Sequence, residues 1–475
     1  MLRPLVRPGT GGAAGTSRTA RGSHAATGTR HLAAKAASLV LVAILAGCGG
    51  SPATGAPGSS PASTAAAPSS SVSSVHATAS PTVEAPASAS APQGVQPPAL
   101  TPALAARLAA TLRRVRSADH LPGIQVVVGY RGGWTWSAHA GMADLATGQP
   151  VTNDTLFDAG SITKTFVATL TLQLVDEGVL RLDDPVTRWV TGVPGVTGVT
   201  IRELLDHTSG IDDPFEHPPL LDALGAHPRT AWTPARVLRY VGPRHFAPGR
   251  GWYYSNANYL LLGEIVQAAT GQSVASLLRQ RFLVPLGLSH TFLQGEQPVS
   301  GQAAHGYDSA PTGRPVDLSD GSGYLPFTSL ATALGTAGAL VTTAGDLARW
   351  AQALYGGDVL PPATLSTMLD VGLTRGLHPR WPYGLGVQEI TYRGQISWGH
   401  SGLLSGFHAA MRYFPATGLT IVVLMNDDTV NPDAVVATLL DALEAGAPGA
   451  ARPPASPAAA PASPTALPAP PSARP

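Results

Sequence analysis

Hydrophobic and polar residues recur with two different periods between residues 101 and 446, and each period predicts one kind of secondary structure. Apolar side chains at 104, 108, 112 and 115 are spaced as on one face of a helix. The same spacing recurs in several later segments. Helices are therefore expected over 102–116, 161–177, 257–270, 343–354 and 432–443, with a further helix opening at 199–205.

Strands are predicted near both ends of this stretch. A β-branched run at 124–130 is followed by Arg131-Gly132-Gly133 and a second run at 134–140, which predicts a β-hairpin. Three more strands are expected at 395–400, 407–414 and 419–426. Short connections favour antiparallel pairing. We expect an α+β fold, an antiparallel β-sheet flanked by helices with a mostly helical second lobe, and a site in the cleft between them.

The flanking segments differ sharply in composition from this stretch. Residues 48–100 carry a single charged side chain, Glu84, and residues 447–475 carry only Arg452 and Arg474. Chain so rich in Ala, Pro and Ser cannot bury enough apolar surface to fold. We expect a disordered tether at 48–100, a folded domain at 101–446 and a disordered tail at 447–475.

The first 47 residues are typical of an export signal. A basic stretch precedes the apolar run Ala36–Gly47, which is shorter than the ~20 residues that span a bilayer. The run ends Leu45-Ala46-Gly47-Cys48 and resembles a bacterial lipobox. Cys48 is the only cysteine, so no intramolecular disulfide can form. We expect export and a lipid on Cys48 that anchors the chain to the outer side of the cell membrane; the alternative is ordinary secretion with a free thiol.

Charge excludes one class of partner and singles out one residue. The formal net charge is +1, but six basic residues and no acidic ones lie in 1–47, which leaves 24 basic against 29 acidic residues. A chain of this balance is a poor nucleic-acid binder. After residue 47 there are 23 arginines and one lysine, Lys164. A buried lysine can lose its proton and act as a base, whereas arginine cannot.

Ser161 stands three residues before Lys164, at the start of a predicted helix. This spacing places both side chains on one face, and the helix N-terminus favours a developing oxyanion. A serine hydroxyl becomes a nucleophile when a neighbouring base takes its proton. The pair therefore predicts a catalytic nucleophile and its base. The alternative, that Ser161 only caps the helix, would not explain the lysine.

Two further motifs carry candidate site residues. Tyr254 and Asn256 lie before the helix at 257–270; a phenol can shuttle protons where cations lower its pKa, and an asparagine can donate to a substrate carbonyl. His400, Ser401, Gly402 and Leu403 follow one another at a predicted sheet edge, where glycine lets a substrate lie along the strand. The alternatives are a loop with Asn256 as helix cap, and a strand with a core histidine.

Together the three motifs resemble those of the serine β-lactamase-related hydrolases, of the class C β-lactamase and D-alanyl-D-alanine carboxypeptidase type, over residues 105–445. Segments 200–210, 285–288 and 336–340 also look like this family. The resemblance implies that Ser161 is acylated and that Lys164 and Tyr254 share the acid–base work. By the same resemblance, Asn256 would orient the substrate amide. The N–H groups of Ser161 and Leu403 would form an oxyanion hole. His400 and Ser401 would contact a substrate carboxylate beside Gly402.

His400 stands where class C β-lactamases usually carry lysine, and a histidine is only partly charged at neutral pH. This difference argues against efficient β-lactamase activity and does not choose firmly between a peptidase and an esterase. Because His-x-Gly is familiar in the D-alanyl-D-alanine carboxypeptidases and D-amino-acid peptidases of this family, the resemblance favours a penicillin-binding, D-alanyl-D-alanine carboxypeptidase-like enzyme of the cell envelope. An esterase and a class C-like β-lactamase are the alternatives within the family, and a non-catalytic ligand-binding lipoprotein is the alternative outside it. The expected substrates are an acyl-D-Ala-D-Ala peptide, a β-lactam or an ester, with no cofactor.

Several other polar residues are assigned no catalytic role. The histidines at 207, 217, 227 and 245 lack the spacing of metal ligands, so no metal site is expected, and His207 is expected to be a hydrogen-bonded loop residue. Asp206, Asp212 and Asp213 are expected to be solvated. Residues 399–403 differ from a G-x-S-x-G elbow at Leu403, so an α/β-hydrolase is rejected.

Overall fold

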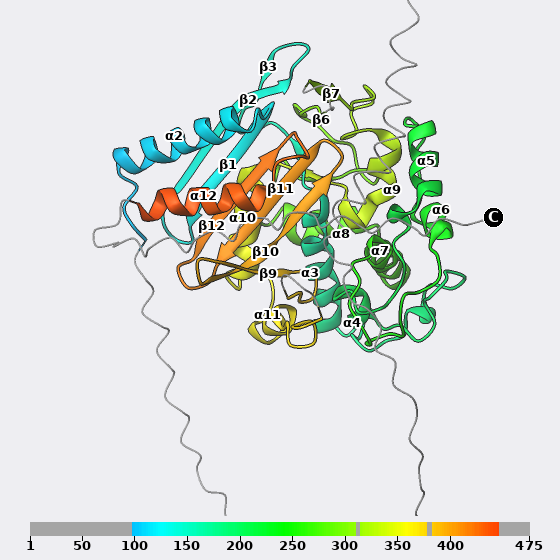
Figure 1. Ribbon diagram of the computed structural model, residues 1–475. Coiled ribbons are helices and arrows are strands. Elements are labelled where there is room, and N and C mark those ends of the chain that lie inside the picture. Colours follow the sequence, from blue (N-terminus) through cyan, green and yellow to red (C-terminus); the bar gives the residue numbers. More distant parts are fainter. Residues whose placement is uncertain (1–96, 310–313, 378–381, 446–475) are drawn as a thin grey trace, which may run out of the picture.

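The structure is a computed structural model that describes residues 97–309, 314–377 and 382–445 (Figure 1). The predicted signal peptide, Cys48, most of the tether and the whole C-terminal tail lie outside the described residues. Within the described part of the chain, none of the helices combines the length and the apolar character needed to span a membrane.

A seven-stranded antiparallel sheet forms one side of the molecule, with the strand order β3-β2-β1-β12-β11-β10-β9. Its strands come from the two ends of the described chain. They are β1 Gly123–Tyr130, β2 Thr135–Asp144, β3 Gln149–Pro150, β9 Gln388–Tyr392, β10 Gln395–Leu404, β11 Phe407–Phe414 and β12 Leu419–Met425. The first and last long strands pair in the middle, from Ile124 opposite Met425 to Tyr130 opposite Leu419. The predicted antiparallel sheet and its flanking helices are confirmed.

Both faces of the central strands are buried. Along β1, Val126 and Val128 join one apolar cluster, while Val127 between them joins the other. Helices α2 (Pro102–Ala118) and α12 (Pro432–Glu444) lie side by side over one face (Figure 1). Helix α10 (Ala344–Tyr355) packs on the opposite face. Burying one such aliphatic side chain is worth about 1.5–3 kcal/mol, so this double cover strongly favours the sheet.

The middle of the chain forms the helical part, to the right of the sheet in Figure 1. Its helices are α3 Thr163–Asp176, α4 Ile201–Leu205, α5 Pro218–Ala226, α6 Pro234–Val237, α7 Asn256–Thr270, α8 Val274–Leu278, α9 Thr328–Gly338 and α11 Pro362–Leu369. Short strands complete it: β4 Phe157–Asp158, β5 Phe292–Leu293, β6 Tyr307–Ser309, β7 Pro315–Asp317 and β8 Leu340–Thr342. Trp350 of α10 joins the two parts, because its ring stacks on Phe166 of α3 at 4.0 Å and its Nε1 donates to Thr165 Oγ1.

Several boundaries differ by a few residues from the sequence-based prediction, and two of these differences concern the site. Helix α3 begins at Thr163, and Ser161 precedes it in a 3₁₀ turn, η1 (Gly160–Ile162). Strand β10 continues to Leu404 instead of ending at His400. The extension is possible because Gly402 packs against the η1 turn, where a Cβ would lie 1.9 Å from the carbonyl oxygen of Ala159.

Candidate active site

Ser161 lies at the junction of the sheet and the helical part, because its η1 turn contacts β10, β11, α3 and α9. Gly160 begins the turn with φ of +51°, a conformation that favours glycine, and its N–H donates to Asp158 Oδ1 at 2.6 Å. Ile162 is the N-cap residue of α3, and no side chain caps that helix. The alternative interpretation, in which Ser161 serves as a helix cap, is therefore wrong.

Lys164 is fully buried and points at Ser161. Its Nζ lies 3.1 Å from Ser161 Oγ, 2.8 Å from Asn256 Oδ1 and 2.7 Å from the carbonyl oxygen of Ala337. Burial lowers the pKa of Lys164 to about 7, against a smaller opposing influence of the Asp213 carboxylate. Both protonation states are therefore populated near neutral pH, which suits a general base.

The partners of Lys164 determine what its neutral amine can do. Asn256 Oδ1 and the Ala337 carbonyl oxygen can only accept hydrogen bonds. A neutral amine has two N–H groups, and these two acceptors use both of them. Its lone pair is then directed at the third partner, the hydroxyl of Ser161. The geometry thus allows Lys164 to accept the Ser161 proton without any rearrangement.

Tyr254 approaches Ser161 from the other side. Its Oη lies 2.7 Å from Ser161 Oγ, and Lys164 Nζ lies 4.7 Å from the centre of its ring. Desolvation raises the pKa of the Tyr254 phenol above its ordinary value, even though the bond to Ser161 opposes this shift. The expectation that neighbouring cations lower this pKa is wrong, because burial raises it and the charge of Asp213 adds to the rise. The phenol stays protonated and can donate a hydrogen bond.

Asn256 links Lys164 to a carboxylate that the sequence did not single out. Asn256 is the first residue of α7; its Oδ1 accepts from Lys164, and its Nδ2 donates to Asp213 Oδ2 at 2.8 Å. Ser255, rather than Asn256, occupies the N-cap position of α7. Asp213 therefore orients the Asn256 amide and places a negative charge near the buried lysine.

The three aspartates expected to be solvated are buried, so that prediction is wrong. Asp206, Asp212 and Asp213 are only 4%, 3% and 2% exposed. Each finds local donors that replace water. Asp206 Oδ1 accepts from the Thr208 hydroxyl, and Asp212 accepts from Gly242 N and from both His217 and His245. The Asp-x-Thr spacing at 206–208 was the signal that could have indicated such a satisfied carboxylate.

The third motif brings the backbone of β10 against the Ser161 turn. Strand β9 pairs with β10 only as far as Gly399, so the edge beyond it is left to η1. A Cβ on Gly160 would lie 2.8 Å from Leu403 N. The N–H groups of Ser161 and Leu403 therefore belong to two elements in backbone contact, as a pair of oxyanion donors requires.

His400 is buried and neutral. Its Nδ1 donates to the Ser401 carbonyl oxygen at 2.6 Å, so its Nε2 accepts from Tyr383 Oη at 2.9 Å. Desolvation, aided by the charge of Lys164, lowers the pKa of His400 to about 3. The partial positive charge expected at neutral pH is therefore absent from this residue, because burial disfavours the imidazolium.

Ser401 points to the opposite face of the sheet from His400, as successive strand residues do. Its hydroxyl donates to Asp433 Oδ2 at 2.8 Å and also contacts Arg412 Nη2. In this structure the side chains of His400 and Ser401 thus both have protein partners.

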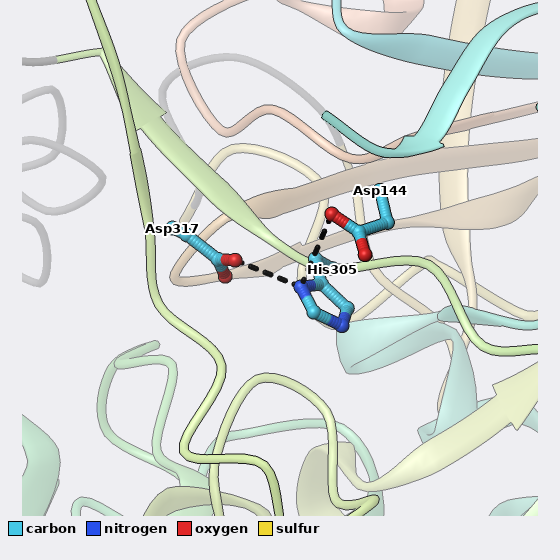
Figure 2. Close-up of side chains that lie close together, drawn as sticks. All are labelled: Asp144, His305 and Asp317. Atoms are coloured by element: carbon cyan, nitrogen blue, oxygen red, sulfur yellow. Dashed lines mark hydrogen bonds and ion pairs between the residues drawn. The ribbon is translucent and has the colours of Figure 1, made fainter. Parts of the chain in front are cut away.

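One cluster of metal-ligand types lies elsewhere in the described part of the chain. The ligand atoms of Asp144, His305 and Asp317 lie within 4.8 Å of one another (Figure 2). His305 Nδ1 bonds Asp317 Oδ2 at 2.8 Å, and this bond raises the pKa of His305. Asp144 is already bonded to the Thr147 hydroxyl and to Ala146 N. The sequence did not indicate this cluster. Through its ion pairs, His305, which precedes β6, links Asp144 of β2 to Asp317 of β7.

Curated relatives of this chain include hydrolases of several kinds. The unguisins hydrolase ungD of Aspergillus violaceofuscus is 30% identical over 325 residues, which cover 62% of this chain and 56% of that protein. Penicillin-binding protein 4 of Amycolatopsis lactamdurans is 29% identical over 337 residues, 66% of this chain and 82% of that protein. Esterase EstB of Burkholderia gladioli is 33% identical over 232 residues, 46% and 58% of the two chains.

Solved structures show the same fold. A D-stereospecific amidohydrolase from Streptomyces sp. superposes with a TM-score of 0.61 at 27% identity, covering 73% of this chain and 99% of that chain. The D-amino acid amidase from Ochrobactrum anthropi SV3, complexed with L-phenylalanine amide, gives a TM-score of 0.62 at 26% identity, covering 72% and 99%. The family model named Beta-lactamase matches residues 106–446, so the chain belongs to the β-lactamase family of serine hydrolases.

Proposed function

We propose that the chain forms an acyl-enzyme on Ser161 and hydrolyses amide bonds of D-configured peptides, as a penicillin-reactive, D-alanyl-D-alanine carboxypeptidase-like enzyme of the cell envelope. The convergence of Lys164 Nζ and Tyr254 Oη on Ser161 Oγ, at 3.1 and 2.7 Å, carries the proposal. A nucleophile with a base and an acid within hydrogen-bond reach is the arrangement that acyl transfer needs.

The reaction assigns one proton movement to each group. Neutral Lys164 takes the proton of Ser161 Oγ as that oxygen bonds to the substrate carbonyl carbon. The N–H groups of Ser161 and Leu403 bind the negative oxygen, and losing one such donor typically costs ~10²–10³ in rate. Tyr254, kept protonated by desolvation, donates to the leaving nitrogen when the C–N bond breaks, and the proton on Lys164 restores the phenol.

The preference for D-configured amides rests on the relatives. Two solved structures with this fold are described as a D-stereospecific amidohydrolase and a D-amino acid amidase. A relative that matches over 82% of its own length is a penicillin-binding protein. Among the reactions of this family, a D-alanyl-D-alanine carboxypeptidase-like cleavage is the one that joins both properties.

Ester hydrolysis is the second candidate, and His400 is the observation that favours it. Its lowered pKa leaves it neutral, and Ser401 is bonded to Asp433, so the motif presents no charge to a carboxylate. A substrate with an uncharged leaving side would suit such a surface. The similarity to esterase EstB agrees with this alternative.

Intact mass after incubation with benzylpenicillin tests the acyl-enzyme. We expect the intact protein to gain the mass of one penicillin, and a digest to place it on the peptide that contains Ser161. The variants Ser161→Ala and Lys164→Arg should gain no mass. Penicillin destroyed without a lasting adduct would indicate a β-lactamase instead. A chain that neither binds penicillin covalently nor hydrolyses a nitrophenyl ester would be a non-catalytic ligand-binding protein.

Matched substrates separate the two candidates. We would compare an acyl-D-Ala-D-Ala peptide, the same peptide with an amidated C-terminus and nitrophenyl acetate. A preference for the free carboxylate supports the carboxypeptidase. Tenfold faster turnover of the ester, about 1.4 kcal/mol of transition-state binding, would support the esterase.

The envelope location forms part of the same proposal. Residues 1–47 would direct export, and a lipid on Cys48 would hold the enzyme at the membrane, with 48–100 as the tether. Cell fractionation of the wild type and of Cys48→Ala tests it. We expect the wild type in the membrane fraction and the variant in the soluble exported fraction; equal partition of both would contradict a lipid anchor.

A further inference from the structure

His207 contacts the Tyr254 segment at three points. Its carbonyl oxygen accepts from Tyr253 N at 3.0 Å, and its Nδ1 accepts from Ser255 N at 3.2 Å. These two N–H groups belong to the residues directly before and after Tyr254. The ring of His207 lies 4.3 Å from the ring of Tyr254, tilted by 33°. A single residue thus holds the backbone on both sides of the phenol and supports its ring.

The neighbouring hydrogen bonds fix which nitrogen of His207 accepts. Asn258 Oδ1 accepts from the Ser209 hydroxyl at 2.8 Å, so Asn258 Nδ2 is the donor that approaches His207 Nδ1 at 3.1 Å. Two donors therefore meet Nδ1, and the proton of the neutral ring is on Nε2. Desolvation, followed by the charge of Lys164, holds the pKa of His207 well below its ordinary value, so this arrangement persists across neutral pH.

Two features of His207 cost folding free energy. Its φ is +64°, a left-handed conformation that residues other than glycine rarely adopt. Its Nε2 is buried and has no hydrogen-bond partner among the described residues, which costs ~1–3 kcal/mol. Strain that is kept beside an active site points to a role in positioning. The prediction that His207 is a hydrogen-bonded loop residue is confirmed.

We propose that His207 is a positioning residue, whose Nδ1 and ring hold Tyr254 Oη against Ser161 Oγ during acyl transfer. The inference rests on the acyl-enzyme proposed above. The inference goes beyond that proposal, because it assigns the placement of the acid to a fully buried residue that lies outside the three motifs. The critical bond is the one from Ser255 N to Nδ1, since the bond to the His207 carbonyl survives any side-chain change.

Two substitutions separate the acceptor from the ring. His207→Asn places Oδ1 close to the position of Nδ1 and keeps an acceptor without the ring. His207→Phe keeps an aromatic ring and removes the acceptor. We expect His207→Phe to slow acylation by benzylpenicillin at least tenfold with KM for a nitrophenyl ester changed less than threefold, and His207→Asn to recover most of the loss. Equal losses in both variants would overturn the role of Nδ1.

A double-mutant cycle with Tyr254→Phe distinguishes positioning from general destabilisation. If His207 acts through the phenol, His207→Phe should change acylation by less than about twofold once that hydroxyl is gone. The same tenfold loss in the Tyr254→Phe background would overturn the proposal. Thermal unfolding of all variants identifies any that fail to fold, and His207→Asn then carries the comparison.

Hydrogen exchange provides a readout that does not depend on activity. The Ser255 amide should exchange faster in His207→Phe than in the wild type, while amides in the core of α7 keep their rates. Unchanged exchange at Ser255 would overturn the positioning role. If the wild type forms no acyl-enzyme with any probe, the proposed function fails, and the exchange experiment still decides whether His207 holds the Tyr254 segment.

Discussion

At the scale of single residues, the site depends on how burial acts on three ionisable groups of different kinds. Burial lowers the pKa of the Lys164 ammonium to about 7 and that of His400 to about 3, and it raises the pKa of the Tyr254 phenol. In each case the neutral form is favoured. The site therefore offers a neutral amine, a neutral imidazole and a protonated phenol at the same pH, and the amine and the phenol are the two groups that contact Ser161 Oγ.

The Asp213 carboxylate should help to determine the pH at which the enzyme becomes active, because it opposes the effect of burial on the pKa of Lys164. Activity requires neutral Lys164, so kcat/KM should rise as pH increases through a pKa of about 7. Asp213 favours the ammonium and holds that pKa up. Asp213→Asn should therefore move the rising limb to lower pH. The pH profile of ester hydrolysis measures this shift, and a shift to higher pH would contradict the assigned charge effect.

The sequence predicted which residues form the site better than it predicted the buried groups around them and the effect of burial on their pKa values. Ser161, Lys164, Tyr254 and Asn256 could be predicted because their motifs have recognisable spacings, and the fold brings them together. Asp213 was missed because an aspartate in a loop is usually exposed, and its burial depends on donors at Phe215 and Asn256 that only the folded chain brings together. The rise in the Tyr254 pKa was missed for the same reason, since desolvation is a property of packing.

At the scale of secondary-structure elements, the residues on the two faces of β10 contact different parts of the protein. His400 faces Tyr383, and Gly402 packs against the η1 turn. Ser401 faces α12, where it bonds Asp433. The sequence-based prediction ended this strand at His400, because Ser401 and Gly402 are poor strand formers in isolation. Contact with η1 overrides that preference and extends the strand to Leu404.

Gly402 should tolerate no side chain. A Cβ there would lie 1.9 Å from the backbone oxygen of Ala159, so Gly402→Ala must push β10 away from the Ser161 turn. Separating the Leu403 N–H from that turn should slow acylation by ~10² or more, with the fold retained. The rate of penicillin acylation measures the loss. Gly345→Ala is the matched control, because its nearest neighbour is 3.8 Å away and its rate should match the wild type.

Behind β10, an ion pair joins β11 to Asp433 of α12, whose side chain is 23% exposed. Arg412 is fully buried, its guanidinium lies 3.0 Å from Asp433, and it also bonds Gln388 and Ser401. Burial alone would raise the pKa of Asp433, but Arg412 and the hydrogen bonds lower it. The stabilisation is therefore present above the unfolded-state pKa of Asp433 and is lost as pH falls through the lowered value.

Removing one partner of this pair should destabilise the whole domain. Asp433→Ala leaves Arg412 buried without its countercharge, and we expect a loss of about 3 kcal/mol in the free energy of unfolding. Urea unfolding measures it. Asp441→Ala on the same helix is the control, because its pair with Arg393 is exposed and should contribute less than ~1 kcal/mol. Equal effects of the two substitutions would contradict a structural role for the Arg412–Asp433 pair.

At the scale of the whole molecule, segments distant in sequence build one site. Ser161 and Lys164 come from the first turns after the N-terminal hairpin, Tyr254 from the middle of the chain, and Leu403 from the C-terminal strands. The strand-like runs near both ends of the folded domain predicted the sheet. These runs could not predict that β1 and β12 are neighbours, since pairing partners are not encoded in the period of either strand.

The pairing of β1 with β12 also affects when the sheet can form during synthesis of the chain. Synthesis produces β1 first and β12 almost last, so the centre of the sheet stays open until nearly the entire domain is available. A chain that is still emerging has no partner for β1, and the Leu403 side of the site is not yet supported. Contacts of such long sequence separation form slowly. We therefore expect catalytic competence to appear only after the last strands of the sheet have been synthesised.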